Sequence, residues 1–123
     1  MIRRKTTKEI SEIADIASEK IRLLLDDIDF TEQARRNTLY KKYADNKFHH
    51  YVEMEINRYI RALEVIKAFD PTKEKNDICD YGCMIPFLPY ALSIMGYQVS
   101  IVDKYDFYGQ KFKDSIRRFC TDN

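Results

Sequence analysis

Two acidic residues and one glycine stand where an open α/β sheet would bring them to a single edge. Asp80 follows a short apolar stretch, Gly82 comes two positions later, and Asp103 ends a second, β-branched stretch. In such sheets the carboxyl ends of neighbouring parallel strands border the crevice in which nucleotide-like ligands bind. A carboxylate there can accept hydrogen bonds from both hydroxyls of a ribose, and a glycine permits the tight turn beneath the ligand. We therefore expect Asp80, Gly82 and Asp103 to line one ligand crevice.

The elements that must position these residues are a strand, a helix and a second strand. Residues 77–81 and 99–102 have the apolar, β-branched character of short strands. Pro86 and Pro89 between them fit one helix only if both lie in its first turn, where amides have no partner within the helix. That condition starts the helix near Pro86, and Gly96 is placed to cap its end. A short crossover of this kind predicts parallel strands.

The first half of the sequence predicts helices. Thr6 and Glu9 have the spacing of a capping box, which predicts a helix beginning there. Apolar residues then recur every three or four positions, at Ile10, Ile13, Ala17, Ile21, Leu24 and Ile28. A shorter helix is expected over 29–43 and a longer one over 48–69, which Pro71 would end. After the second strand, residues 110–119 predict a further helix, with Arg117 and Arg118 near its C-terminal end.

The expected fold class is therefore α/β: three N-terminal helices, then a βαβα unit with parallel strands. We divide the chain into a helical cap, 1–70, and a ligand-binding unit, 71–123, within one compact domain. Several tyrosines fall on the predicted helices, at Tyr40, Tyr43, Tyr51 and Tyr59. Tyrosine commonly buries its ring and keeps its hydroxyl wet, so a place at the edge of the core is the first interpretation. A substrate-binding or dimerising cap is the second.

Composition excludes several functional classes. The net charge of +1, from 21 basic and 20 acidic residues, gives no electrostatic footprint for nucleic acid or an anionic membrane. No apolar run approaches the roughly 20 residues of a membrane span, and the charged N-terminus is unlike a signal peptide, so we expect a cytoplasmic protein. Three cysteines without a secretory signal argue against a disulfide framework, and their spacing with His49 and His50 does not predict a metal site.

The stretch Asp80-Tyr81-Gly82-Cys83, followed by Gly96-Tyr97-Gln98-Val99 and Ile101-Val102-Asp103, resembles the first two motifs of class I S-adenosylmethionine-dependent methyltransferases. The resemblance covers roughly residues 77–104. It implies a Rossmann-like fold, S-adenosylmethionine as cofactor, Asp80 and Gly82 in the glycine-rich motif, and Asp103 as the acid that holds the cofactor ribose. The gap of 21 positions from Gly82 to Asp103 fits the distance of about 20 residues common in nucleotide-binding folds.

The sequence differs from that family in two respects. Met84 and Pro86 stand where family members usually have further glycines, and the family's sheet normally has seven strands. We therefore expect the N-terminal part of a methyltransferase, truncated or completed by another polypeptide, with the acceptor and the catalytic residues unknown. A dinucleotide-binding unit would need glycines at Met84 and Phe87. The remaining alternative is a non-catalytic binding or assembly module, acting as a homo-oligomer or on a partner, whose nucleotide-fold half is degenerate.

Overall fold

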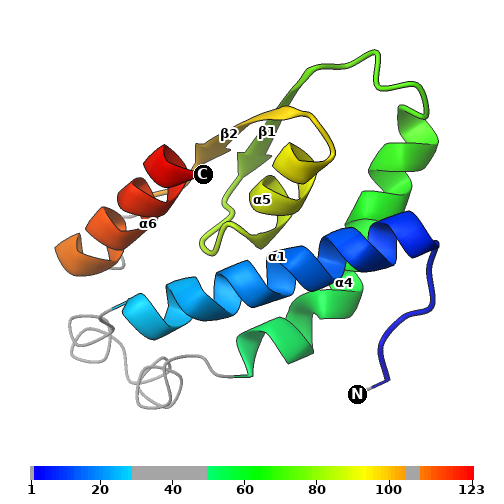
Figure 1. The fold of residues 1–123 in the computed structure, drawn as a ribbon. Helices are drawn as coiled ribbons and strands as arrows, with labels where there is room; N and C mark the ends of the chain where they lie inside the picture. Colours follow the sequence, from blue (N-terminus) through cyan, green and yellow to red (C-terminus); the bar gives the residue numbers. More distant parts are fainter. Residues whose placement is uncertain (1, 29–49, 105–108) are drawn as a thin grey trace.

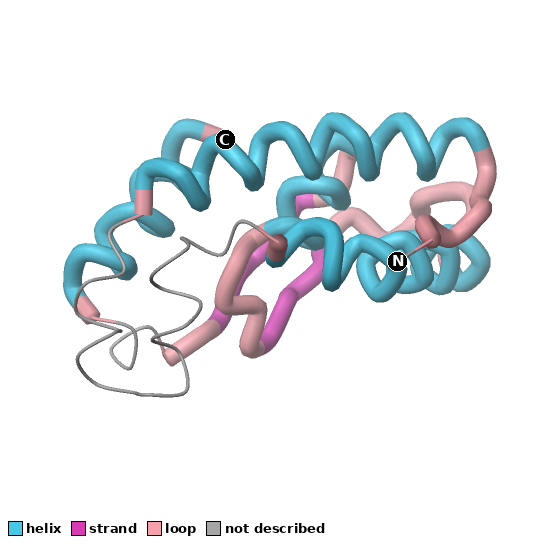
Figure 2. The backbone as a smooth tube through the Cα atoms, turned by 90° about the horizontal axis from the view of Figure 1, so that it is seen from below, coloured by secondary structure: helices cyan, strands magenta, loops and turns pink. Residues whose placement is uncertain are grey.

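A computed structural model describes residues 2–28, 50–104 and 109–123. Within these ranges the chain is mixed α/β, with two helices before a two-stranded parallel sheet (Figure 1). Helices make up most of the described chain, as Figure 2 shows. The elements in chain order are α1 (Lys8–Asp27), α4 (Tyr51–Phe69), β1 (Asp77–Tyr81), α5 (Phe87–Ile94), β2 (Gln98–Val102) and α6 (Gln110–Asp122).

The two strands pair in parallel, as their sequence patterns predict. The register sets Asp77 opposite Gln98 at one end and Tyr81 opposite Val102 at the other. The first strand has the predicted bounds, and the second begins one residue earlier than predicted. Both strands point toward the end of the sheet where α6 lies (Figure 1). Their carboxyl ends therefore form a common edge.

One hydrophobic core joins the helices of the first half to the βα unit. The predicted stripe on α1 is buried throughout, and it packs on α4 and α5. Large core members with almost no exposure come from four helices and the loop before α5, and they include Ile10, Ile21, Ile60, Leu63, Ile85, Phe87, Leu92 and Phe112. The helices lie on one side of the strands (Figure 1). Along both strands, exposed residues alternate with half-buried ones, so one face of the sheet is covered and the other is open.

The predicted start of the first helix is wrong by one residue. Thr7 is the N-cap, and its hydroxyl accepts a hydrogen bond from the amide of Ile10. The predicted partners have other contacts: the hydroxyl of Thr6 donates to Glu64, and Glu9 forms an ion pair with Lys67. The two Thr residues are chemically alike, so long-range contacts to α4 decide which of them caps the helix. The predicted helix over 29–43 lies outside the described residues, so the prediction of three N-terminal helices is confirmed for two of them.

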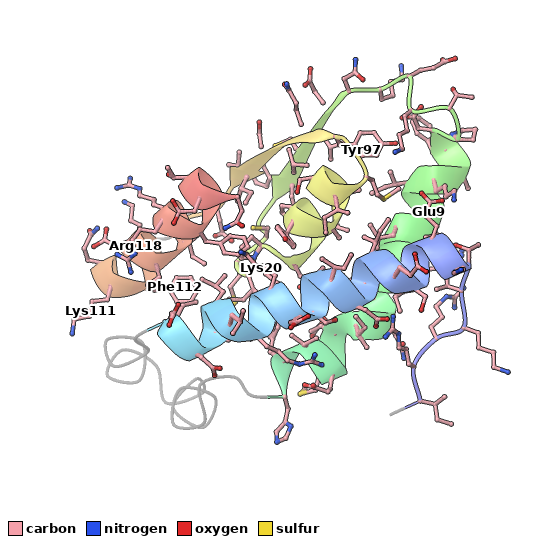
Figure 3. The ribbon with its side chains drawn as sticks, in the orientation of Figure 1. Glu9, Lys20, Tyr97, Lys111, Phe112 and Arg118 are labelled. Atoms are coloured by element: carbon pink, nitrogen blue, oxygen red, sulfur yellow. The ribbon has the colours of Figure 1, made fainter. Side chains whose placement is uncertain are left out.

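Asp70 fastens the end of α4 to the sheet. It is buried, and its carboxylate accepts hydrogen bonds from the amides of Glu74 and Lys75 at 2.8 and 3.2 Å. The hydroxyl of Tyr97, just before β2, donates to the same carboxylate at 2.9 Å. Figure 3 shows Tyr97 between α5 and the end of α4. A single carboxylate thus fixes how the helical half meets both strands.

The helices of the second half begin and end close to the predicted positions. Pro86 is the N-cap of α5 rather than its first residue, which leaves Pro89 within the first turn as the steric argument requires. The last helix continues to Asp122, so Arg117 and Arg118 lie before its final turn rather than at its end. In the described part of the chain, no helix is both long enough and apolar enough to cross a membrane.

Candidate functional site

Gly82 and Asp103 lie together at the carboxyl edge of the strands. The amide of Gly82 donates to the carbonyl of Val102 at 2.6 Å, which extends the pairing of the strands by one residue. Both residues line a hollow of about 680 Å³ between the strand ends and α6. Its other lining residues are Tyr81, Val102, Lys104, Lys113 and Arg117. Gly82 and Asp103 therefore lie at one edge of the sheet, as the strand pattern predicts.

Asp103 also supports the loop that joins β1 to α5. Its Oδ2 atom accepts a hydrogen bond of 2.6 Å from the amide of Met84. The contact joins residues 19 positions apart, so it ties the loop to the end of the neighbouring strand. A hydrogen bond to a charged acceptor is stronger than one between neutral groups. One oxygen of Asp103 therefore has a structural role.

The loop takes two left-handed backbone conformations. Gly82 has a φ of 77° and Met84 a φ of 51°. A Cβ atom built on Gly82 would meet nothing within 4 Å, so the space beside this glycine is open. The half-buried Met84 side chain packs against the hydrophobic core. The position where the sequence lacks an expected glycine thus still adopts a backbone geometry that favours glycine.

Asp80 is near the hollow but does not line it. Its half-buried carboxyl is within electrostatic range of two charged groups, Asp103 and Arg58 of α4. Burial raises the pKa of the Asp80 carboxyl above its ordinary value, Arg58 partly offsets that rise, and Asp103 adds to it. The structure therefore brings all three predicted residues to one end of the sheet, with Asp80 on the side that faces α4.

Two tyrosines of α4 pack at the base of this loop. The Tyr59 ring stacks on Phe87 with 4.4 Å between ring centroids, and its hydroxyl lies 2.6 Å from that of Tyr51. Burial raises the pKa of both phenols. The Arg58 guanidinium lies over the Tyr59 ring at 5.1 Å from its centroid. As the first interpretation expects, these two rings are buried or half-buried, but their hydroxyls lie against each other. Tyr40 and Tyr43 lie outside the described residues.

The basic residues of the hollow were missed from the sequence. Lys104 directly follows Asp103, and Lys113 and Arg117 are four positions apart on α6, so they share a face of that helix. The spacing of Lys113 and Arg117 is visible in the sequence. It predicts a basic site only when the position of α6 beside the strand ends is known, and that position depends on tertiary packing.

The arrangement offers the carboxylate of Asp103 for a diol and open space beside Gly82. It also offers three basic side chains, which we call the basic wall: Lys104, Lys113 and Arg117. None of these groups is paired with a second one in the manner of a nucleophile and its base. Comparison of the chain with family models, curated proteins and solved structures found no match.

Proposed function

We propose that the chain binds S-adenosylmethionine and forms part of a cytoplasmic methyltransferase, with residues 71–123 as a partial Rossmann-like unit and 1–70 as its helical cap. The observation that supports this most directly is the convergence of Gly82 and Asp103 on one hollow at the carboxyl ends of two parallel strands. Ligands of open α/β sheets bind at such an edge.

The residues present fit the nucleoside part of that cofactor. With Oδ2 of Asp103 engaged by Met84, its Oδ1 atom is the group we assign to the ribose hydroxyls. The open space beside Gly82 lets a ligand approach the backbone closely. Met84 stands where the family usually has a glycine, but its side chain packs on the core and does not fill the space beside Gly82.

The reaction would transfer a methyl group from a sulfonium to an oxygen or nitrogen nucleophile. The S–C bond breaks with its electron pair remaining on sulfur, the nucleophile forms the new bond to carbon, and the nucleophile's proton leaves to solvent. The part we assign to this chain is binding and orientation, which supply much of the rate gain when donor and acceptor are held in line. We assign no general base to the described residues.

Isothermal titration calorimetry of the full chain with S-adenosylhomocysteine tests this proposal. We expect saturable binding to the wild type and binding weakened about tenfold or more in Asp103→Asn, because a ribose hydroxyl loses its charged acceptor. The matched control is Asp77→Asn, the same substitution at the other end of the sheet, which should leave the affinity unchanged. An absence of binding by the wild type at millimolar ligand would refute the proposal.

The alternative, a non-catalytic assembly module, is favoured by one observation. Tyr81 is 84% exposed and Val102 is 43% exposed on neighbouring strands, and the described helices lie on one side of the sheet. Parallel sheets are usually covered on both faces, so a second copy or a completing polypeptide would bury this surface. Sedimentation velocity of wild type and Tyr81→Ser separates the two functions. Because Tyr81 also lines the hollow, ligand binding is tested on the wild type. Self-association lost in Tyr81→Ser, together with no binding of S-adenosylhomocysteine by the wild type, would favour assembly.

A further inference from the structure

The basic wall consists of three side chains that line the hollow, Lys104 after β2 and Lys113 and Arg117 on α6. Asp103 is the only acidic residue among the described lining residues. Over the whole sequence basic and acidic residues nearly balance, at 21 and 20. The basic wall is therefore a local concentration of positive charge and does not follow from composition.

Some of the basic residues elsewhere in the described fold are paired with carboxylates. Among the described residues, the recorded ion pairs between elements include those of Arg4 with Glu64 and of Arg22 with Glu53. Neither Lys104 nor Arg117 takes part in an ion pair recorded for these residues, and both side chains are exposed. Two cations thus border a hollow whose single carboxylate already accepts a hydrogen bond.

We propose that the basic wall binds an anionic group, a phosphate or a carboxylate, carried by the methyl acceptor. The existence of an anion subsite follows from the hollow itself, whereas its assignment to the acceptor rests on the proposed function. A guanidinium and an ammonium that converge on one space match the oxygens of such a group, the guanidinium in fork geometry and the ammonium as a point charge. A cationic acceptor would be repelled by the same wall, so the substrate class is a small anionic molecule.

Inorganic phosphate is the probe for the subsite. We would titrate it into the ¹⁵N-labelled full chain and follow amide shifts by NMR, with a parallel titration of sodium chloride at matched ionic strength to separate binding from screening. Saturable shifts at the amides of Lys104 and Arg117 are expected with phosphate and not with chloride. Equal shifts in both salts, or shifts confined to other regions, would overturn the subsite.

Variants on α6 make the test specific. Arg117→Gln should weaken phosphate binding by about fivefold or more, because it removes a charge-assisted contact. Lys111→Gln is the control, since it removes the same charge from the same helix. Figure 3 shows Lys111 at the start of α6, pointing away from the sheet. Equal affinities in the two variants would overturn the role of Arg117, and both sites are exposed, so both proteins should fold.

The cofactor's own carboxylate is the competing source of the anion. If Arg117 bound it, Arg117→Gln would weaken S-adenosylhomocysteine while sparing 5′-methylthioadenosine, which lacks the carboxylate, and the assignment to the acceptor would fall. Unchanged affinity for both nucleosides supports the assignment. Phosphate binding at Arg117 without binding of either nucleoside would remove the proposed function and the assignment to an acceptor, and would leave the anion subsite in place.

Discussion

Asp103 is expected to have two separable roles, and two substitutions distinguish them. One oxygen holds the amide of Met84, and the other is the proposed acceptor for a ribose. Asp103→Ala removes both oxygens. Asp103→Asn keeps a carbonyl oxygen that can still accept from Met84, but it replaces the second oxygen with a donor and removes the charge. The alanine variant alone would therefore confuse loss of the ligand contact with loss of the loop.

The magnitudes follow from the hydrogen bond. A short bond from a backbone amide to a charged acceptor contributes about 1.5–3 kcal/mol. Since both Asp103 and Met84 are half-buried, water can partly replace the lost acceptor, and we expect Asp103→Ala to lower the free energy of unfolding by about 1–2 kcal/mol. Asp103→Asn retains a neutral bond and should lose about 0.5–1 kcal/mol. For binding of S-adenosylhomocysteine the two variants should be equally poor, weakened about tenfold or more.

Urea denaturation followed by circular dichroism measures the first effect, and calorimetry measures the second. Asp77→Asn again serves as the control for both, because Asp77 is exposed at the opposite end of the sheet, where the neighbouring strand begins. Equal destabilisation by alanine and asparagine would show that the acceptor oxygen does not hold the loop. Wild-type affinity in Asp103→Asn would show that the carboxylate does not hold the ribose.

Three further predictions concern stability. Because the pKa of Asp80 is raised in the folded state, stability falls as pH rises from the ordinary value of 3.8 through the folded value. Asp80→Asn should therefore be more stable than wild type at pH 7 in urea denaturation. A gain in stability that persisted below pH 3.8 would contradict this cause. At the left-handed φ of Met84, glycine should be more stable than alanine by about 1 kcal/mol, although both lose the same side-chain packing, so equal midpoints would refute strain at this position. Asp70→Ala removes the buried carboxylate and should lower the free energy of unfolding by about 2–4 kcal/mol, whereas Tyr97→Phe removes one of its donors and should lower it by about 1 kcal/mol. A smaller loss for Asp70→Ala than for Tyr97→Phe would contradict this.

Local chemistry was enough to predict most elements of the second half. Two prolines three positions apart leave a helix almost no freedom in where it starts, and α5 begins accordingly. The strand over 77–81 was predictable because its apolar run is short and is bounded by a turn residue. The capping residue of α1 was not, because Thr6 and Thr7 offer the same hydroxyl and only contacts across the fold select between them.

The candidate site was predictable only in its first layer. Gly82 and Asp103 could be paired because the parallel arrangement of two strands fixes which ends meet. The contact from Asp103 to the amide of Met84 depends on the path of the loop, and the basic wall depends on where α6 packs. The role of Asp70 was hidden in part for the same reason: two of its donors, the amides of Glu74 and Lys75, are close in sequence, but the third, the hydroxyl of Tyr97, is 27 positions away.

The double role of Asp103 links ligand binding to the order of the loop. A ligand that binds the folded site and not the unfolded chain stabilises the fold by an amount that grows with the logarithm of its affinity. If the ribose shares the carboxylate that binds the amide of Met84, a fluctuation that breaks this hydrogen bond also releases the ligand. Opening of the loop and release of the ligand are then one coupled equilibrium. Amide exchange at Met84 should then slow on addition of S-adenosylhomocysteine in the wild type. In Asp103→Ala it should already be fast and should not respond, whereas a response of equal size in that variant would mean that the ligand orders the loop without Asp103.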